Sequence, residues 1–129
     1  MIGTDIIEVC RIEKLIKDKG YKFLNKIYTQ IEIDYCESKG PSKYQHYAGR
    51  FAAKEAVFKA SSSWHSKDKF NLLKFKDIEI LNTYEPETIR HGKPIVNILN
   101  HNFCIDEIHV SISHVKEYAI AFVATGLFK

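Results

Sequence analysis

Glu55 is the one acidic side chain in a stretch of apolar, small and basic residues, GRFAAKEAVFKA at positions 49–60. At about 100° per residue, the helix expected here puts Glu55 on one stripe with these neighbours: Ala48, Phe51, Ala52, Phe58 and Lys59. Three other side chains fall well round the helix from that stripe: Arg50, Lys54 and Val57. A carboxylate on an apolar stripe costs desolvation unless a cation or hydrogen-bond donors compensate. Lys59 lies one turn further on, so a half-buried ion pair and a chemical role for Glu55 are both open hypotheses.

A second carboxylate, Asp5, lies inside a short alternating stretch, IGTDIIEV at positions 2–9. The alternation predicts a strand with Asp5 on the same side as Gly3, Ile7 and Val9. Taken singly, such an aspartate is more often a turn or cap residue. Two carboxylates without a local reason for burial nevertheless suggest a hard cation with oxygen ligands. Magnesium suits such a site, because it takes one or two carboxylates, keeps several waters and completes its shell with substrate phosphate.

Neutral hydrogen-bonding side chains share one side of a later stretch, IHVSIS at positions 108–113. Alternation predicts a strand whose apolar side faces the core and whose other side carries His109, Ser111 and Ser113. These three groups could hold phosphate oxygens. The alternative is a solvated polar face of an antiparallel sheet, which is locally the commoner case.

Positive charge is concentrated between Arg11 and Lys26. The segment carries Glu13 and Asp18 against six basic residues: Arg11, Lys14, Lys17, Lys19, Lys22 and Lys26. Such a run is usually a solvated helix face, but it could also dock an anionic partner. The aromatic and basic strand pattern of single-strand nucleic-acid binders is missing, so an acidic protein is the better candidate than nucleic acid.

The first half of the chain predicts helices. RIEKLIKD at 11–18 starts one, which Gly20 interrupts and residues 21–28 resume. Thr29 and Glu32 form a T-x-x-E capping box, which begins a further helix that ends near Gly40-Pro41. A longer helix then runs from about Ser42 to Ala60.

The second half predicts strands at 78–81, 95–99, 108–113 and 118–124. The last two form a hairpin around a tight loop at 114–117. We therefore expect an α+β fold, with helices mostly early and an antiparallel sheet later, in a single domain that spans residues 1–129.

Composition limits the classes of protein that remain. With 45% hydrophobic and 27% charged residues, the 129-residue chain is typical of a soluble globular protein. It has neither a run of about 18 apolar residues nor a secretory signal pattern, so we expect no membrane association and a cytoplasmic location. The odd, widely spaced cysteines indicate reduced thiols, and His101 with Cys104 is too small a set for a zinc site.

Four sequence blocks together carry a family resemblance: GTDIIEVCRI, the Y-T-x-x-E pattern at 28–32, RFAAKEAVFKA and HVSISHVKEYAIAFV. GKP at 92–94 also matches. In this order and spacing, the blocks resemble the small, trimeric holo-[acyl-carrier-protein] synthase branch of the 4′-phosphopantetheinyl transferase superfamily. The resemblance runs from end to end of the chain. Ser61-Ser62-Ser63-Trp64 departs from it, because the family has a glycine-containing loop there.

The resemblance implies an enzyme that moves the 4′-phosphopantetheine group of coenzyme A onto a serine of apo acyl carrier protein. The reaction releases adenosine 3′,5′-bisphosphate, depends on magnesium and supports fatty acid biosynthesis. The family fold implies a homotrimer with sites between neighbouring subunits.

The resemblance also implies site residues. Asp5 and Glu55 match the magnesium ligands, and Lys59 matches a lysine that contacts the coenzyme's phosphates. Three further residues match positions that line the coenzyme site: Arg50, His109 and Ser111. Arg11 matches a position that contacts the acidic carrier protein, with Lys14 and Lys22 as its expected companions. Thr29 and Glu32 are taken as structural.

Two other classes of protein remain open from the sequence. One is a basic binding module that uses the 11–26 segment and does no chemistry. The other is a magnesium-dependent hydrolase of a nucleotide-like pyrophosphate, with the same carboxylates and water as nucleophile.

Overall fold

The computed structural model describes residues 1–61, 73–83, 92–100 and 107–126. Its elements follow in the order β1 (Ile2–Glu8), α1 (Val9–Lys19), α2 (Tyr21–Ile27), α3 (Gln30–Glu37), α4 (Lys43–Ala60), β2 (Ile78–Asn82), β3 (Pro94–Ile98), β4 (Ile108–His114) and β5 (Tyr118–Thr125), with short 3₁₀ turns at Gly40–Ser42 and Phe75–Asp77. The predicted α+β class is confirmed, with boundaries within two residues for most elements. None of the described helices combines the length and apolar character that a membrane crossing needs. The residues singled out above that lie outside the described ranges are Ser62, Ser63, Trp64, His101 and Cys104.

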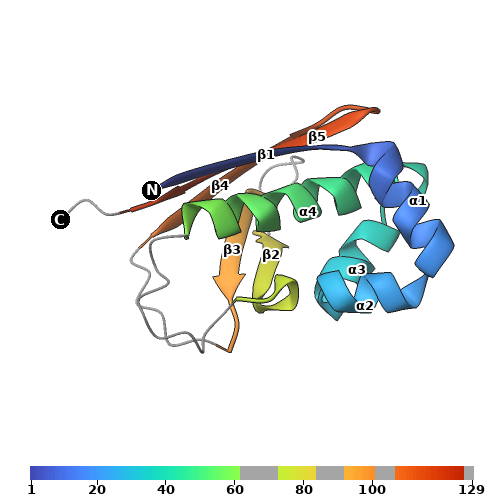
Figure 1. Ribbon diagram of the computed structural model, residues 1–129, viewed down its shortest axis with the longest axis horizontal. Helices are drawn as coiled ribbons and strands as arrows, with labels where there is room; N and C mark the ends of the chain where they lie inside the picture. Colours follow the sequence, from blue (N-terminus) through green and yellow to red (C-terminus); the bar gives the residue numbers. More distant parts are fainter. Residues whose placement is uncertain (62–72, 84–91, 101–106, 127–129) are drawn as a thin grey trace.

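The strands form two antiparallel sheets. One has the order β1-β5-β4, and the other is the pair β2-β3. The predicted hairpin of β4 and β5 is present, and β1 adds to its far edge, with Asp5 opposite Ala121. Figure 1 shows α4 between the three-stranded sheet and the β2-β3 ribbon, while α1, α2 and α3 gather near one end of α4.

The central helix α4 is covered on more sides than its sequence pattern predicts. Arg50, Lys54 and Val57, which fall away from the predicted apolar stripe, are buried, at 4%, 0% and 0% exposure. On the stripe itself, Glu55 is only half-buried and Lys59 is exposed. The stripe is therefore a partly open side of α4, because the sheet and the ribbon with α3 cover the other sides.

Gly3 sets how closely β1 lies on α4. A Cβ atom at this position would come within 2.0 Å of the Ala56 carbonyl oxygen and 2.8 Å of the Ala60 nitrogen, so no side chain fits. The predicted alternation of β1 is confirmed, since Gly3 and Ile7 are buried and Asp5 is half-buried on the same side. This close approach lays the Asp5 side of β1 along the turn of α4 that contains Glu55.

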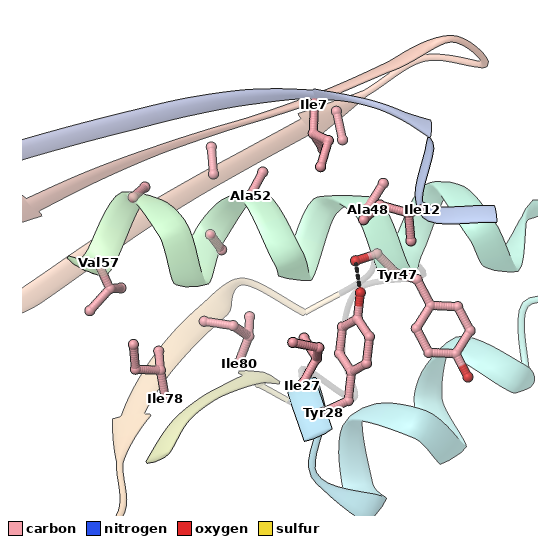
Figure 2. Close-up of a cluster of buried hydrophobic side chains, with 14 of the residues drawn as sticks. Ile7, Ile12, Ile27, Tyr28, Tyr47, Ala48, Ala52, Val57, Ile78 and Ile80 are labelled. Atoms are coloured by element: carbon pink, nitrogen blue, oxygen red, sulfur yellow. Dashed lines mark hydrogen bonds between the residues drawn. The ribbon is translucent and has the colours of Figure 1, made fainter. Parts of the chain in front are cut away.

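Two buried polar groups anchor the helical end of the core. The Tyr28 hydroxyl donates a hydrogen bond of 2.8 Å to the Tyr47 carbonyl oxygen (Figure 2). The Thr29–Glu32 capping box is present as predicted, with the Glu32 carboxylate 2.8 Å from the Thr29 backbone nitrogen. Both arrangements fix where α3 begins against α4.

Lys54 and Glu32 form a fully buried ion pair of 2.6 Å that the sequence pattern did not predict. The Lys54 ammonium also donates to the carbonyl oxygens of Ile27 and Phe75, at 2.7 and 2.9 Å. The second Glu32 oxygen accepts a hydrogen bond of 3.0 Å from the Ile80 nitrogen. Burial lowers the pKa of Lys54, although the charge of Glu32 opposes that shift. One ion pair thus joins α2, α3, β2 and the 75–77 turn to α4.

Candidate active site

A cleft of about 480 Å³ lies where β1, α1 and the open side of α4 meet. Its wall is apolar, with Ile12, Leu15 and Phe51 among the lining residues. Five charged side chains also line it: Asp5, Glu8, Arg11, Glu55 and Lys59. The cleft therefore brings together all three residues predicted to be catalytic, from two elements about 50 residues apart in the chain.

Of the two hypotheses for Glu55, the structure does not support the ion pair with Lys59. The Lys59 ammonium donates instead to Asp5 Oδ1 at 3.0 Å and to the Thr4 carbonyl oxygen at 2.9 Å. Glu55 has no hydrogen bond or ion pair with the rest of the described chain. Partial burial raises the pKa of Glu55, and the nearby charge of Asp5 raises it further, while Lys59 opposes both. Within the described ranges, the cleft thus holds a half-buried carboxylate without a protein partner, facing a second carboxylate.

The donors in this cleft suit a hard divalent cation. Asp5 and Glu55 offer carboxylate oxygens only, and magnesium binds through one or two carboxylates with waters and substrate phosphate. Among the residues that the structure describes, no group of three or more His, Cys, Asp or Glu side chains could hold a metal ion, so a cation here would complete its shell with water and substrate oxygens. The arrangement fits magnesium better than zinc, which in proteins prefers four ligands rich in cysteine and histidine.

A second cavity, of about 770 Å³, adjoins the first and shares Leu15, Phe51 and Glu55 with it. Its floor is apolar, and the aromatic rings of Phe51 and Phe75 stack there with centroids 5.4 Å apart. Three lysines of the basic segment line its rim: Lys19, Lys22 and Lys26. Arg11 lines the first cleft, and Lys14 is exposed but lines neither. The basic segment therefore borders both cavities.

Arg50 does not lie in the cleft with the carboxylates. It is buried on another side of α4, where its guanidinium donates to Asn82 Oδ1 at 2.7 Å and lies 3.9 Å from the centre of the Tyr35 ring. Its Nε is buried and has no hydrogen-bond partner in the described part of the chain. Arg50 lines a separate hollow of about 240 Å³ with Asn82, Gly92 and His114.

His109 and Ser111 lie apart from both cavities and from Arg50. They are exposed on the outer face of β4, as alternation predicted, and His109 pairs with Glu107 at 3.2 Å. Within this chain, the residues predicted to line the coenzyme site are therefore not brought together with Asp5, Glu55 and Lys59.

His114 is a candidate that the sequence interpretation missed. It was assigned to the loop after β4, but it is the last residue of that strand and lines the hollow beside Arg50. Its Nδ1 lies 2.9 Å from Gln45 Oε1, and burial lowers its pKa. The signal was present in the sequence, because His114 continues the inward alternation of Val110 and Ile112.

Comparison with known proteins gives one consistent result. A family model described as the 4′-phosphopantetheinyl transferase superfamily matches residues 1–123. The holo-[acyl-carrier-protein] synthase of Ruminiclostridium cellulolyticum is 41% identical to this chain, over 98% of this chain and 92% of its own length. The holo-[acyl-carrier-protein] synthase of Halothermothrix orenii is also 41% identical, over 95% of this chain and 93% of its own length.

Solved structures agree with the sequence comparison. A holo-[acyl-carrier-protein] synthase from Helicobacter pylori, in complex with coenzyme A, superposes with a TM-score of 0.77 at 34% identity, over 98% of this chain and 100% of that one. A holo-(acyl-carrier-protein) synthase from Bacillus anthracis, in complex with CoA (3′,5′-ADP), gives a TM-score of 0.71 at 39% identity, over 96% and 93%.

Proposed function

The chain belongs to the 4′-phosphopantetheinyl transferase superfamily, and we propose that it transfers the 4′-phosphopantetheine group of coenzyme A to a serine of apo acyl carrier protein. One observation carries this proposal: β1 and α4 bring two carboxylates and an ammonium group into one cleft beside a basic surface. The product, holo acyl carrier protein, would serve fatty acid biosynthesis in the cytoplasm, which suits the free thiols Cys10 and Cys36.

In the proposed reaction, the serine hydroxyl loses its proton, for which water is a better acceptor than a carboxylate committed to magnesium. The serine oxygen bonds to the phosphorus that carries pantetheine, the bond from that phosphorus to the nucleotide's phosphate oxygen breaks, and adenosine 3′,5′-bisphosphate leaves. Such a transfer needs positioning and charge neutralisation more than covalent catalysis. Asp5 and Glu55 would hold magnesium, which when bound stabilises negative charge on the pyrophosphate. Lys59 supplies a further positive charge in the same cleft, for a phosphate oxygen of the coenzyme. The apolar wall at Leu15 and Phe51 would keep bulk water from the carboxylates.

We further propose that the working form is a homotrimer with each site between two subunits. The outer face of the β1-β5-β4 sheet carries an exposed apolar patch, a feature that often marks a protein–protein interface. Four large apolar side chains there are 44–66% exposed: Ile2, Ile6, Ile120 and Phe122. Ser111 lies beside Phe122 on this face. Covering the face with a neighbour would bring Ser111 and His109, which lie on it, close to another subunit. Sedimentation of the purified protein tests this, and a monomer at micromolar concentration would refute it.

Intact-mass measurement tests the proposed function. Incubation with coenzyme A, magnesium and an apo carrier protein should add one phosphopantetheine to the carrier. A binding module would leave every mass unchanged. A magnesium-dependent hydrolase would cleave coenzyme A with or without the carrier and leave the carrier unmodified. Either of these outcomes would overturn the transferase proposal.

We expect the basic segment to bind the carrier protein, because the carrier implied by the family resemblance is acidic. Reversing Arg11 and Lys14 to glutamate should raise the KM for the carrier several-fold. Lys14→Glu alone, which lies outside both cavities, should leave the KM for coenzyme A nearly unchanged. Arginine can bind a carboxylate through two parallel hydrogen bonds, which makes Arg11 the stronger contact. Exposed charges are screened beyond about 8 Å at physiological salt, so added salt should narrow the gap between variant and wild type.

The control for this prediction is Lys43→Glu, because Lys43 pairs with Glu37 at 3.2 Å outside the basic segment. Its carrier KM should stay near the wild-type value across the salt series. Equal carrier KM values for the Arg11/Lys14 variant and the wild type at low salt would mean that this face is only solvated surface. Lys22, on the rim of the larger cavity, would then be the next residue to reverse.

A further inference from the structure

The contact between Lys59 and Asp5 occupies the carboxylate that a divalent cation would need. The ammonium lies 3.0 Å from Asp5 Oδ1 and is held from its other side by the Thr4 carbonyl oxygen, at 2.9 Å. Glu55, the second carboxylate of the cleft, receives no such bond from the described residues. The charge of Lys59 therefore partly balances the two carboxylates of the cleft, and it pairs with the one on β1, Asp5, and not with the one on α4, Glu55.

The geometry of this contact makes it exchangeable. The Lys59 side chain is 53% exposed and that of Asp5 is 17% exposed, so water reaches one partner freely. Ion pairs with exposed partners contribute only about 0–1 kcal/mol, which a divalent cation attracted by two carboxylates can exceed. Two cations beside the same oxygen repel each other, and this repulsion is stronger in a half-buried cleft than in water. Lysine and metal therefore cannot share Asp5 without cost.

We propose that Lys59 is a stand-in cation: it holds Asp5 until a divalent cation binds, and the cation then releases its ammonium group to bind the substrate's phosphates. This inference rests on the proposed function of the cleft. The exchange has a thermodynamic consequence. Once Lys59 no longer pairs with Asp5, its ammonium group can pair with a phosphate of the substrate and so favours substrate binding. Cation and coenzyme should then strengthen each other's binding through Lys59, in addition to any direct contact between them.

Binding of Mn²⁺, followed by electron paramagnetic resonance without coenzyme or carrier, tests the exchange. Lys59→Met keeps the length of the side chain and removes its charge. We expect this variant to bind Mn²⁺ more tightly than the wild type, by roughly fivefold, since the competitor for Asp5 is gone. Lys43→Met is the matched control, because it removes another ion-paired lysine from the same helix, and its Mn²⁺ affinity should not change.

A second readout is the effect of coenzyme A on Mn²⁺ affinity. Coenzyme A should tighten Mn²⁺ binding by a larger factor in the wild type than in Lys59→Met, because only the wild type has an ammonium to release. Melting curves without metal check that the variant is folded, and Lys59→Gln replaces it if it is not. Mn²⁺ affinity that is equal to or weaker than that of the wild type in the folded variant would overturn the exchange.

The exchange and the proposed function fail in different ways. A protein that transfers phosphopantetheine normally, but whose Lys59→Met variant binds Mn²⁺ no more tightly, would refute the exchange alone. A protein that shows the expected gain in Mn²⁺ affinity, but never modifies a carrier, would refute the transferase proposal and keep the exchange.

Discussion

Replacing Asp5 with asparagine, or Glu55 with glutamine, is expected to lower the rate of phosphopantetheine transfer by about 10²–10³ or more while the fold survives. Each change keeps the shape of the side chain and one oxygen acceptor but removes the negative charge that would bind magnesium. In Asp5→Asn, the amide oxygen of the new side chain can still accept the Lys59 hydrogen bond. The rate should therefore fall most at limiting magnesium and recover in part when the metal is added in excess.

The stability of these variants carries independent information. Glu55 is half-buried, lacks a partner among the described residues and has a raised pKa, so its charge costs stability in the folded state. Glu55→Gln should consequently melt at or above the wild-type temperature, as expected of a residue kept for function rather than for folding. Asp34→Asn is the control, because the side chain of this exposed acid bonds to Gln30 on the surface and should change neither rate nor melting temperature. Near-normal transfer by both cleft variants at limiting magnesium would contradict the site assignment.

Lys54→Met is expected to destabilise the protein by about 3–5 kcal/mol, the usual cost of removing one partner from a buried ion pair. The substitution leaves the Glu32 carboxylate buried without its cation and leaves the Ile27 and Phe75 carbonyl oxygens without a donor. Urea unfolding at a fixed protein concentration measures the loss, since assembly would otherwise shift the apparent stability.

Two further variants separate the ion pair from general effects of losing a lysine. Adding Glu32→Gln to Lys54→Met should recover part of the loss, because the buried charge is removed while an oxygen acceptor remains for the Thr29 or Ile80 nitrogen. Lys17→Met removes the surface pair with Glu13 and should cost less than about 1 kcal/mol. If Lys54→Met cost no more than Lys17→Met, the buried pair would be energetically unimportant.

The sequence predicted the local elements well because the signals for them are local. Alternation in β1 and β4 assigned the inward and outward sides correctly, and the Thr29–Glu32 pattern located the start of α3. The pairing of β1 with β5 involves residues more than 100 positions apart, and nothing in either strand specifies its neighbour.

The errors in the site have a common physical cause. A helical wheel tells which side chains of α4 share a side, but not how many sides other elements cover. The sequence therefore suggested the nearest lysine, Lys59, as the partner of Glu55, whereas β1 supplies Asp5 to Lys59 and α3 supplies Glu32 to Lys54. Partners that come from other elements are decided by tertiary packing, which spacing along one helix does not contain.

The cleft depends on Gly3, although Gly3 is not among the residues that line it. When a new side chain collides with another side chain, a second mutation that shrinks the neighbour can restore the protein. A methyl group at position 3 would instead collide with the carbonyl oxygen of Ala56 and the nitrogen of Ala60. Backbone atoms are the same in every amino acid, so no replacement of the colliding residues can act as a suppressor. In a mutational scan, we thus expect every substitution at position 3 to impair the protein, and we expect no second mutation at position 56 or 60 to restore it.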